Sequence, residues 1–196
     1  MKISLSQKSA RKGFTLIEMI GVLAVIAILA SLLIPKIFEA INNARISNAA
    51  LSYNTVKTAM ADHYAKFGTL PLTNFFDRTL VGEAFLDKNF TVKIGNDTAV
   101  AGGTQRVDIV ASVLPAALPT TTDAAYALDG GVLNTALGSA VVEAIIPGVL
   151  ESDARALSLL LDGPAMSTAI GVSDIVGRVK YATGSPTTVY IYVTHR

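Results

Sequence analysis

The chain has 196 residues, enough for one domain with a hydrophobic core, and 51% of them are apolar. Its formal net charge is +1 and it contains no cysteine, which argues against a basic nucleic-acid groove and excludes disulfides and a thiol nucleophile. Much of the apolar content lies in residues 14–34, where 21 residues carry a single charge, Glu18. As a helix this segment measures about 31 Å, which matches the ~30 Å hydrocarbon thickness of a bilayer. It is long enough to span a membrane.

Residues 1–13 precede this segment and contain four basic residues and no acidic one, namely Lys2, Lys8, Arg11 and Lys12. Basic flanks stay on the cytoplasmic side, so we expect the amino terminus inside and the carboxyl terminus outside. We interpret residues 1–13 as a removable leader. Its removal leaves 12 basic and 15 acidic residues, a net charge of about −3.

Glu18 lies inside the apolar segment, where an unpaired carboxylate costs on the order of 3 kcal/mol. No Lys or Arg lies between Phe14 and Pro35. We therefore expect that Glu18 pairs with a group that this chain alone does not supply.

The sequence Gly-Phe-Thr-Leu-Ile-Glu, residues 13–18, resembles the processing site of the type IV pilin and pseudopilin family. The resemblance implies that a prepilin peptidase cuts after Gly13, that the new amine of Phe14 is methylated, and that Phe14 and Glu18 act in assembly. Pro35 matches the helix-kinking proline of the family, and proline bends a helix by removing a backbone hydrogen bond. The similarity extends to about Phe67.

Residues 14–67 are predicted to form one helix of about 80 Å, ended by Gly68 and Pro71. Beyond Pro35, apolar and aromatic residues recur every three or four positions and predict a stripe that packs on a sheet. The residues expected to pack are Phe38, Ile41, Tyr53, Val56, Met60, Tyr64 and Phe67. We expect an α+β, lollipop-like fold with a leader (1–13), a membrane and assembly half-helix (14–35) and a globular domain (36–196).

The remaining chain predicts short elements. Residues 74–82 indicate a short helix and residues 83–88 a turn, while residues 115–131, rich in Ala, Thr, Pro and Gly, indicate an exposed connection. Helices are also predicted at residues 134–146 and 152–162, the second capped by Ser152. Alternating patterns predict about four strands, at residues 90–94, 106–113, 176–182 and 187–194, and the last two form a hairpin.

The residues that carry chemistry are few. His63 and His195 have no second ligand at metal-binding spacing, and no nucleotide-binding or nucleophile motif occurs. We therefore expect neither an enzyme nor a cofactor. The only ion considered is Ca²⁺, which Asp87, Asn89, Asn96 and Asp97 would bind, although solvated turn residues are the better interpretation. Tyr190 and Tyr192 share one face of the last strand, which favours sheet packing over base stacking.

Together these features favour a pilin-like structural subunit, processed by prepilin peptidase, delivered by an inner-membrane assembly platform and polymerised with copies of itself. It would move from the cytoplasmic membrane to a cell-surface filament. The alternatives are a pseudopilin of a type II secretion system in the periplasm, a minor pilin that binds DNA for uptake, and a membrane-anchored binding protein. The acidic balance after leader removal disfavours DNA binding.

Overall fold

The computed structural model describes residues 13–95, 104–112, 120–130 and 135–196. Its internal contacts divide the chain into a unit that ends at Asn42 and a second unit, Asn43–Arg196. Helix α1 (Leu16–Phe67) contributes to both units and continues through Pro35 without interruption. The predicted long helix, including its end beside Gly68, is confirmed.

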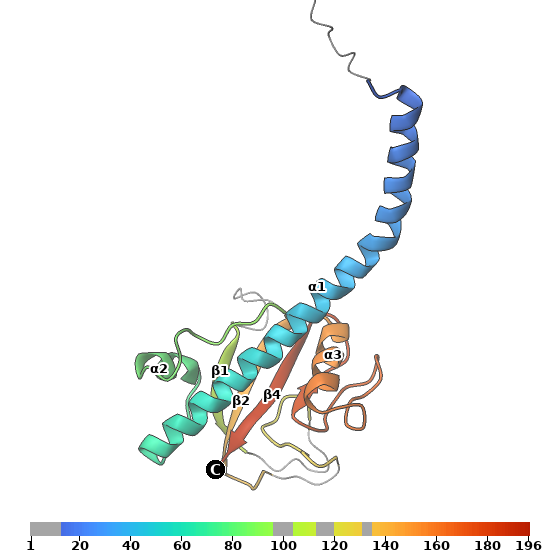
Figure 1. Ribbon diagram of the computed structural model, residues 1–196. Coiled ribbons are helices and arrows are strands. Elements are labelled where there is room, and N and C mark those ends of the chain that lie inside the picture. Colours follow the sequence, from blue (N-terminus) through green and yellow to red (C-terminus); the bar gives the residue numbers. More distant parts are fainter. Residues whose placement is uncertain (1–12, 96–103, 113–119, 131–134) are drawn as a thin grey trace, which may run out of the picture. The chain divides into compact units, whose positions relative to one another are not determined.

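Among the described residues, a four-stranded antiparallel sheet forms the centre of the second unit (Figure 1). Its order is β1-β2-β4-β3, and the predicted hairpin of the last two strands is confirmed, with Val179 opposite Ile191. The strands are β1 (Arg106–Ala111), β2 (Ala140–Val149), β3 (Val179–Tyr181) and β4 (Thr187–His195). Strand β4 pairs with both β2 and β3, so it lies inside the sheet.

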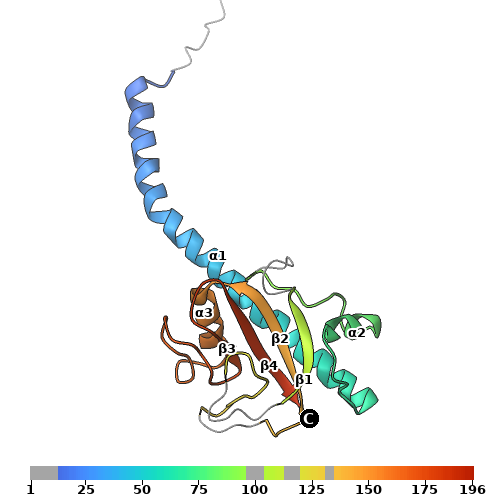
Figure 2. The same ribbon diagram turned by 180° about the vertical axis from the view of Figure 1, so that it is seen from behind.

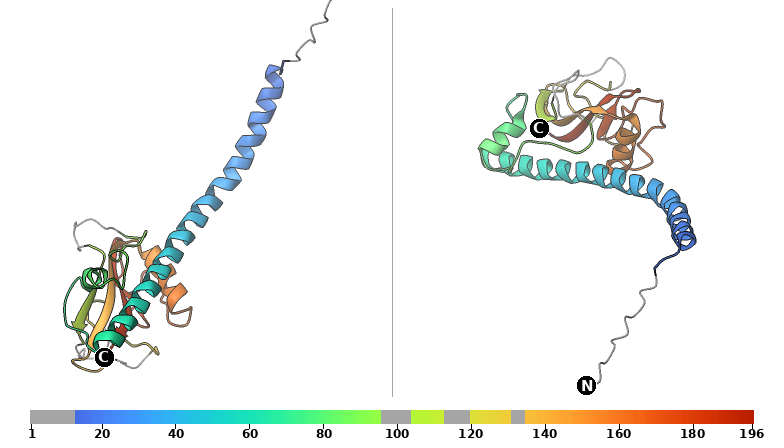
Figure 3. Two further views of the ribbon diagram at one scale, coloured as in Figure 1. Left: turned by 60° about the vertical axis from the view of Figure 1, so that its left-hand side comes forward. Right: turned by 90° about the horizontal axis from the view of Figure 1, so that it is seen from above.

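One face of the sheet packs against α1 beyond Asn43 (Figure 3). Tyr53, Val56 and Met60 are buried there with side chains from β1, β2 and β4, and the Tyr53 hydroxyl donates a hydrogen bond to the Tyr192 carbonyl oxygen at 3.0 Å. Helices α2 (Phe76–Gly82) and α3 (Glu151–Leu161) complete the same core. The α+β class, with a long amino-terminal helix, a small antiparallel sheet and extra short helices, is confirmed.

The opposite face of the sheet is covered by residues 120–128, which we call the covering segment (Figure 2). Lys180, fully buried on β3, donates hydrogen bonds to the Thr120, Asp123 and Ala125 carbonyl oxygens and pairs with the Asp123 carboxylate at 3.0 Å. Three backbone oxygens and one carboxylate thus satisfy a charge that would otherwise be costly to bury. One amine therefore fixes the covering segment to the sheet.

Next to Lys180, the buried Tyr126 hydroxyl donates a hydrogen bond to a Glu143 oxygen at 2.9 Å. Burial raises the pKa of Glu143 to about 7, although the bond from Tyr126 and the charge of Lys180 oppose the shift. Burial also lowers the pKa of Lys180, against the opposing effect of Asp123. The exposed connection predicted for residues 115–131 is wrong at 124–127, which are buried; residues 113–119 and 131–134 lie outside the described residues.

The helix predicted at residues 134–146 is wrong, because residues 140–149 form β2, the strand between β1 and β4. Both faces of β2 are covered, so nearly every residue from Val141 to Val149 is buried and no alternating pattern marks the strand. Its β-branched pairs, Val141-Val142 and Ile145-Ile146, suit a pleated strand better than a helix. Residue 134 itself lies outside the described part.

The strand predicted at residues 90–94 is also wrong, since no ladder includes this segment. The Gln105 side chain accepts a hydrogen bond from the Val92 amide and donates to the Val92 and Ile94 carbonyl oxygens, at 3.2 and 3.1 Å. A side chain therefore takes the place of a partner strand. Gly95 ends the segment at φ +73°, where a Cβ would lie 2.5 Å from the Pro147 carbonyl oxygen, so the close approach to β2 requires glycine.

The cap predicted for α3 is wrong by two residues, although the helix itself is confirmed. Leu150 is the N-cap residue and makes no side-chain capping bond, so Ser152 already lies in the first turn. The first-turn carboxylate of Glu151 instead accepts hydrogen bonds from the Gly171 and Gly184 amides. It ties two loops to the helix start rather than capping it.

Candidate functional site: the amino-terminal assembly segment

The site predicted from the sequence centres on Gly13, Phe14 and Glu18, directly before and within the first turn of α1. Phe14 is 81% exposed, and the added Cβ of a substituted Gly13 would meet no atom within 4 Å. The Gly13–Phe14 peptide therefore lies outside the helix, with no side chain packed against the glycine. A protease that needs an accessible backbone outside regular structure finds one here.

Thr15 and Glu18 bond to each other in a reciprocal way. One Glu18 carboxylate oxygen, Oε2, accepts hydrogen bonds from the Thr15 amide and hydroxyl, both at 2.8 Å, and the Glu18 amide donates to the Thr15 hydroxyl oxygen at 3.3 Å. Because α1 begins at Leu16, Thr15 is the N-cap residue and Glu18 the third helical residue. This arrangement is a capping box, which satisfies amides that the first turn leaves unpaired.

The expectation that this chain alone offers Glu18 no partner is therefore wrong, because Thr15 supplies two donors. The signal was present in the sequence as Thr-x-x-Glu, the spacing of a capping box. The second carboxylate oxygen, Oε1, accepts no hydrogen bond from the described residues. Glu18 thus has one oxygen held within its own helix and one available to another group.

The first half of α1 presents its apolar side chains outward all round. Between Leu16 and Ile34 the large apolar residues are 47–78% exposed. Of the described residues, only α1 contains a window long and apolar enough to cross a membrane. A soluble surface does not keep so large an apolar area in water, so a bilayer or other copies of the helix must cover it.

The predicted packing stripe is buried only in part, and the division between its exposed and buried residues falls near the boundary between the two units. Tyr53, Val56 and Met60 are buried, and burial begins at Ile46. Tyr64 is half-buried, whereas Phe67 is 46% exposed at the helix end. Phe38 and Ile41, 68% and 52% exposed, precede Asn43 and lie outside the buried stripe.

The other candidate residues take structural positions. His63 is buried among Phe67, Phe76 and Phe85, with Nε2 3.2 Å from a Glu83 oxygen. Tyr192 packs against Tyr126, as sheet packing predicts. Of the four residues considered for Ca²⁺, Asp87 and Asn89 are exposed, while Asn96 and Asp97 lie outside the described residues. The described part of the chain holds no group of three or more His, Cys, Asp or Glu arranged for a metal.

A long apolar helix with an acidic first turn, continued by an amphipathic half on a small antiparallel sheet, defines the class of pilin-like proteins. Residues 8–34 match the family model described as the prokaryotic N-terminal methylation motif. The "Fimbrial protein" of Neisseria meningitidis serogroup A is 36% identical over 64 residues, 33% of this chain and 38% of the relative. The "Type IV major pilin protein PilE1" of Neisseria gonorrhoeae is also 36% identical over 64 residues, 39% of its length. This chain is therefore similar to type IV pilins over about a third of its length.

The match spans less than two fifths of these relatives. The residues that match the family model, 8–34, include the capping box and the exposed apolar half of α1. The sheet, the covering segment and α3 lie outside these residues.

Proposed function

We propose that the chain is a structural subunit of a type IV pilus-like filament, cut after Gly13, methylated on the Phe14 amine and polymerised through α1. The observation that carries the proposal is the methylation motif at the start of a helix whose apolar surface is exposed on all sides. Before assembly, the bilayer covers this surface and holds the subunit in the cytoplasmic membrane. In the filament, the helices of neighbouring copies cover one another. The role is structural rather than catalytic.

Glu18 sets the axial register between copies in this proposal. Its Oε2 caps the helix of its own subunit, and its free Oε1 faces the methylated Phe14 amine of a neighbour. That amine keeps its positive charge, because a secondary amine remains basic. At ~4 Å and an effective dielectric of 20, the Coulomb attraction is about 4 kcal/mol, before the cost of removing both charges from water. Apolar packing then supplies most of the assembly energy, and the ion pair selects one stagger.

The processing step is tested by Gly13→Val in cells that make prepilin peptidase. A β-branched side chain next to the scissile bond obstructs the close approach of the protease to the backbone, so we expect uncut precursor in the membrane. Gly21→Val is the matched control, because its added side chain also meets no atom within 4 Å and lies beyond the cleavage site. Amino-terminal mass spectrometry of the wild type should give a methylated Phe14. A mature chain that keeps Met1, or begins after Ile34, would contradict the proposal.

The kind of filament is tested by shearing cells and identifying the released protein. Abundant subunit in sheared surface filaments supports a pilus. Processed subunit that stays entirely in the cell envelope would instead favour a pseudopilin of a type II secretion system.

A further inference from the structure

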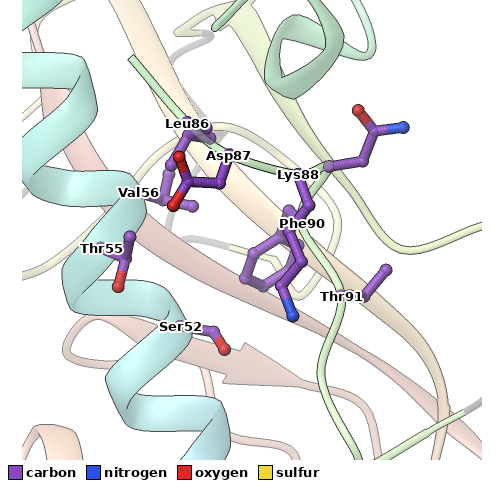
Figure 4. A pocket seen from close by; sticks show the side chains of 9 residues that line it. Ser52, Thr55, Val56, Leu86, Asp87, Lys88, Phe90 and Thr91 are labelled. Atoms are coloured by element: carbon purple, nitrogen blue, oxygen red, sulfur yellow. The ribbon is translucent and has the colours of Figure 1, made fainter. Parts of the chain in front are cut away.

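A pocket of about 300 Å³ lies between α1 and the loop that follows α2, entirely within the second unit (Figure 4). Ser52, Thr55 and Val56 line it from α1, and residues 86–91 line it from the loop. The two walls are at least 30 residues apart in the sequence, and the packing of the long helix on the sheet brings them together. The volume lies at the lower end of the ~300–1,000 Å³ typical of small-molecule sites.

The pocket has an apolar floor and a polar rim. Val56, Leu86 and Phe90, at most 8% exposed, form the floor as part of the main core. Asp87, Lys88 and Asn89 are exposed at the rim, and the Asp87 carboxylate points toward α1 (Figure 4).

The rim side chains make no bonds of their own. In the described residues, Ser52, Asp87, Lys88 and Asn89 take part in no side-chain hydrogen bond or ion pair, although Asp87 and Lys88 are neighbours of opposite charge. The polar groups that secure the nearby backbone are different ones, such as Asp77, which accepts a hydrogen bond from the Phe90 amide at 3.1 Å. The loop is therefore fixed through its backbone, and its exposed polar side chains are available to bind a ligand.

This combination fits the chemistry of a neutral sugar. A carboxylate accepts hydrogen bonds from two vicinal hydroxyl groups, while an ammonium and a serine hydroxyl donate to the ring and hydroxyl oxygens. The C–H face of a sugar ring is apolar and suits a floor made of valine, leucine and phenylalanine. One acidic and one basic group at the rim leave no net charge to attract an ionic ligand.

We propose that this pocket binds a neutral mono- or disaccharide, with Asp87 as the principal hydrogen-bond acceptor and Lys88 as a donor. The site uses residues 52–91 of the globular unit and none of the assembly segment. It therefore does not depend on the proposed filament function. Affinity in the millimolar range is expected, because a small ligand at an open site makes few contacts.

The test uses the isotopically labelled full chain in dodecylphosphocholine micelles, since detergents with sugar head groups would compete for the pocket. D-glucose, D-galactose, D-mannose and N-acetylglucosamine are titrated separately while backbone amide signals are followed by NMR. We expect at least one sugar to produce saturable shifts at Ser52, Thr55 and residues 86–91. The variants Asp87→Ala and Lys88→Ala should weaken that binding by about tenfold or more, because each removes a bond to the sugar.

Asp62→Ala is the matched control, because Asp62 is equally an exposed carboxylate but lies outside the pocket. It should leave the affinity unchanged. Absence of saturable shifts with all four sugars at about 100 mM would overturn the proposal, as would equal weakening by Asp62→Ala and Asp87→Ala. Shifts at these residues with CaCl₂ but with no sugar would also overturn it, since Asp87 would then be a cation ligand.

Discussion

Val56 provides a direct test of how the second half of α1 is held. Its side chain is 2% exposed and packs in the core between the helix and the sheet, whereas the next residue toward the amino terminus, Thr55, is exposed. The test compares Val56→Asp with Thr55→Asp in a truncated chain that begins at Asn43, the first residue of the globular unit. Both variants add the same charge to the same turn of helix, one inside the core and one in water.

The expected loss at Val56 has two parts. Removing a buried valine side chain from the core costs about 1.5–3 kcal/mol, and leaving a carboxylate there without a partner costs about 3–5 kcal/mol. Their sum is comparable to the 5–15 kcal/mol that typically separates the folded from the unfolded state. Val56→Asp should therefore lower Tm by more than about 10 °C or prevent folding, while Thr55→Asp should change it by no more than about 2 °C.

Thermal unfolding followed by circular dichroism measures both variants without detergent. The wild-type truncated chain serves as the reference and should melt cooperatively. If Val56→Asp melted within about 2 °C of that reference, residue 56 would face solvent, and the packing of α1 on the sheet would be refuted.

Two further predictions concern carboxylates. Glu18→Ala should still be cut and inserted into the membrane but should enter filaments poorly, because the charge that selects the register is lost. Glu18→Asp, in which the charge is only displaced, should be intermediate. A normal filament yield from Glu18→Ala in cells without wild-type subunit would exclude an assembly role for the carboxylate. Burial raises the pKa of Glu143 from 4.5 to about 7, so between these pH values the folded chain binds more protons than the unfolded chain. The unfolding free energy should fall by about 2 to 3 kcal/mol from about pH 5 to about pH 8, and urea unfolding should show this loss in the wild type but not in Glu143→Gln. The same slope in both chains would contradict the shift.

The elements that the sequence predicts well are those set by local signals. The long helix has an uninterrupted apolar and then amphipathic pattern ended by Gly68, and the hairpin has a Gly-Ser-Pro turn between two alternating segments. The two elements that were predicted wrongly, a helix at residues 134–146 and a strand at residues 90–94, depend on contacts with residues that are distant in the sequence. Strand β2 lacks an alternating pattern because the covering segment buries its second face. Residues 90–94 are not a strand, because their backbone bonds to the side chain of Gln105 instead of to a partner strand.

The candidate site depends less on tertiary contacts than the fold does, and its roles in processing and assembly stay predictions. Gly13, Phe14 and Glu18 lie in one continuous segment, so their arrangement needs no tertiary contact. The capping role of Thr15 was not predicted, although the Thr-x-x-Glu spacing to Glu18 is the sequence signal of a capping box. The pocket at Asp87 was beyond prediction, since its α1 wall is placed by the docking of the helix on the sheet.

The sheet order has a consequence for how the chain is made. Strand β4 begins at Thr187 and separates β2 from β3, so β3 has no partner, and β2 has only β1, until the final residues emerge. Synthesis at ~5–20 residues per second leaves the buried face of α1, including Val56, uncovered for on the order of ten seconds after it is translated. In the proposed function, the first half-helix is in the membrane during that interval, with an exposed apolar stripe beside it. We therefore expect quality control of this protein to act at the membrane, on a tethered and unfinished domain.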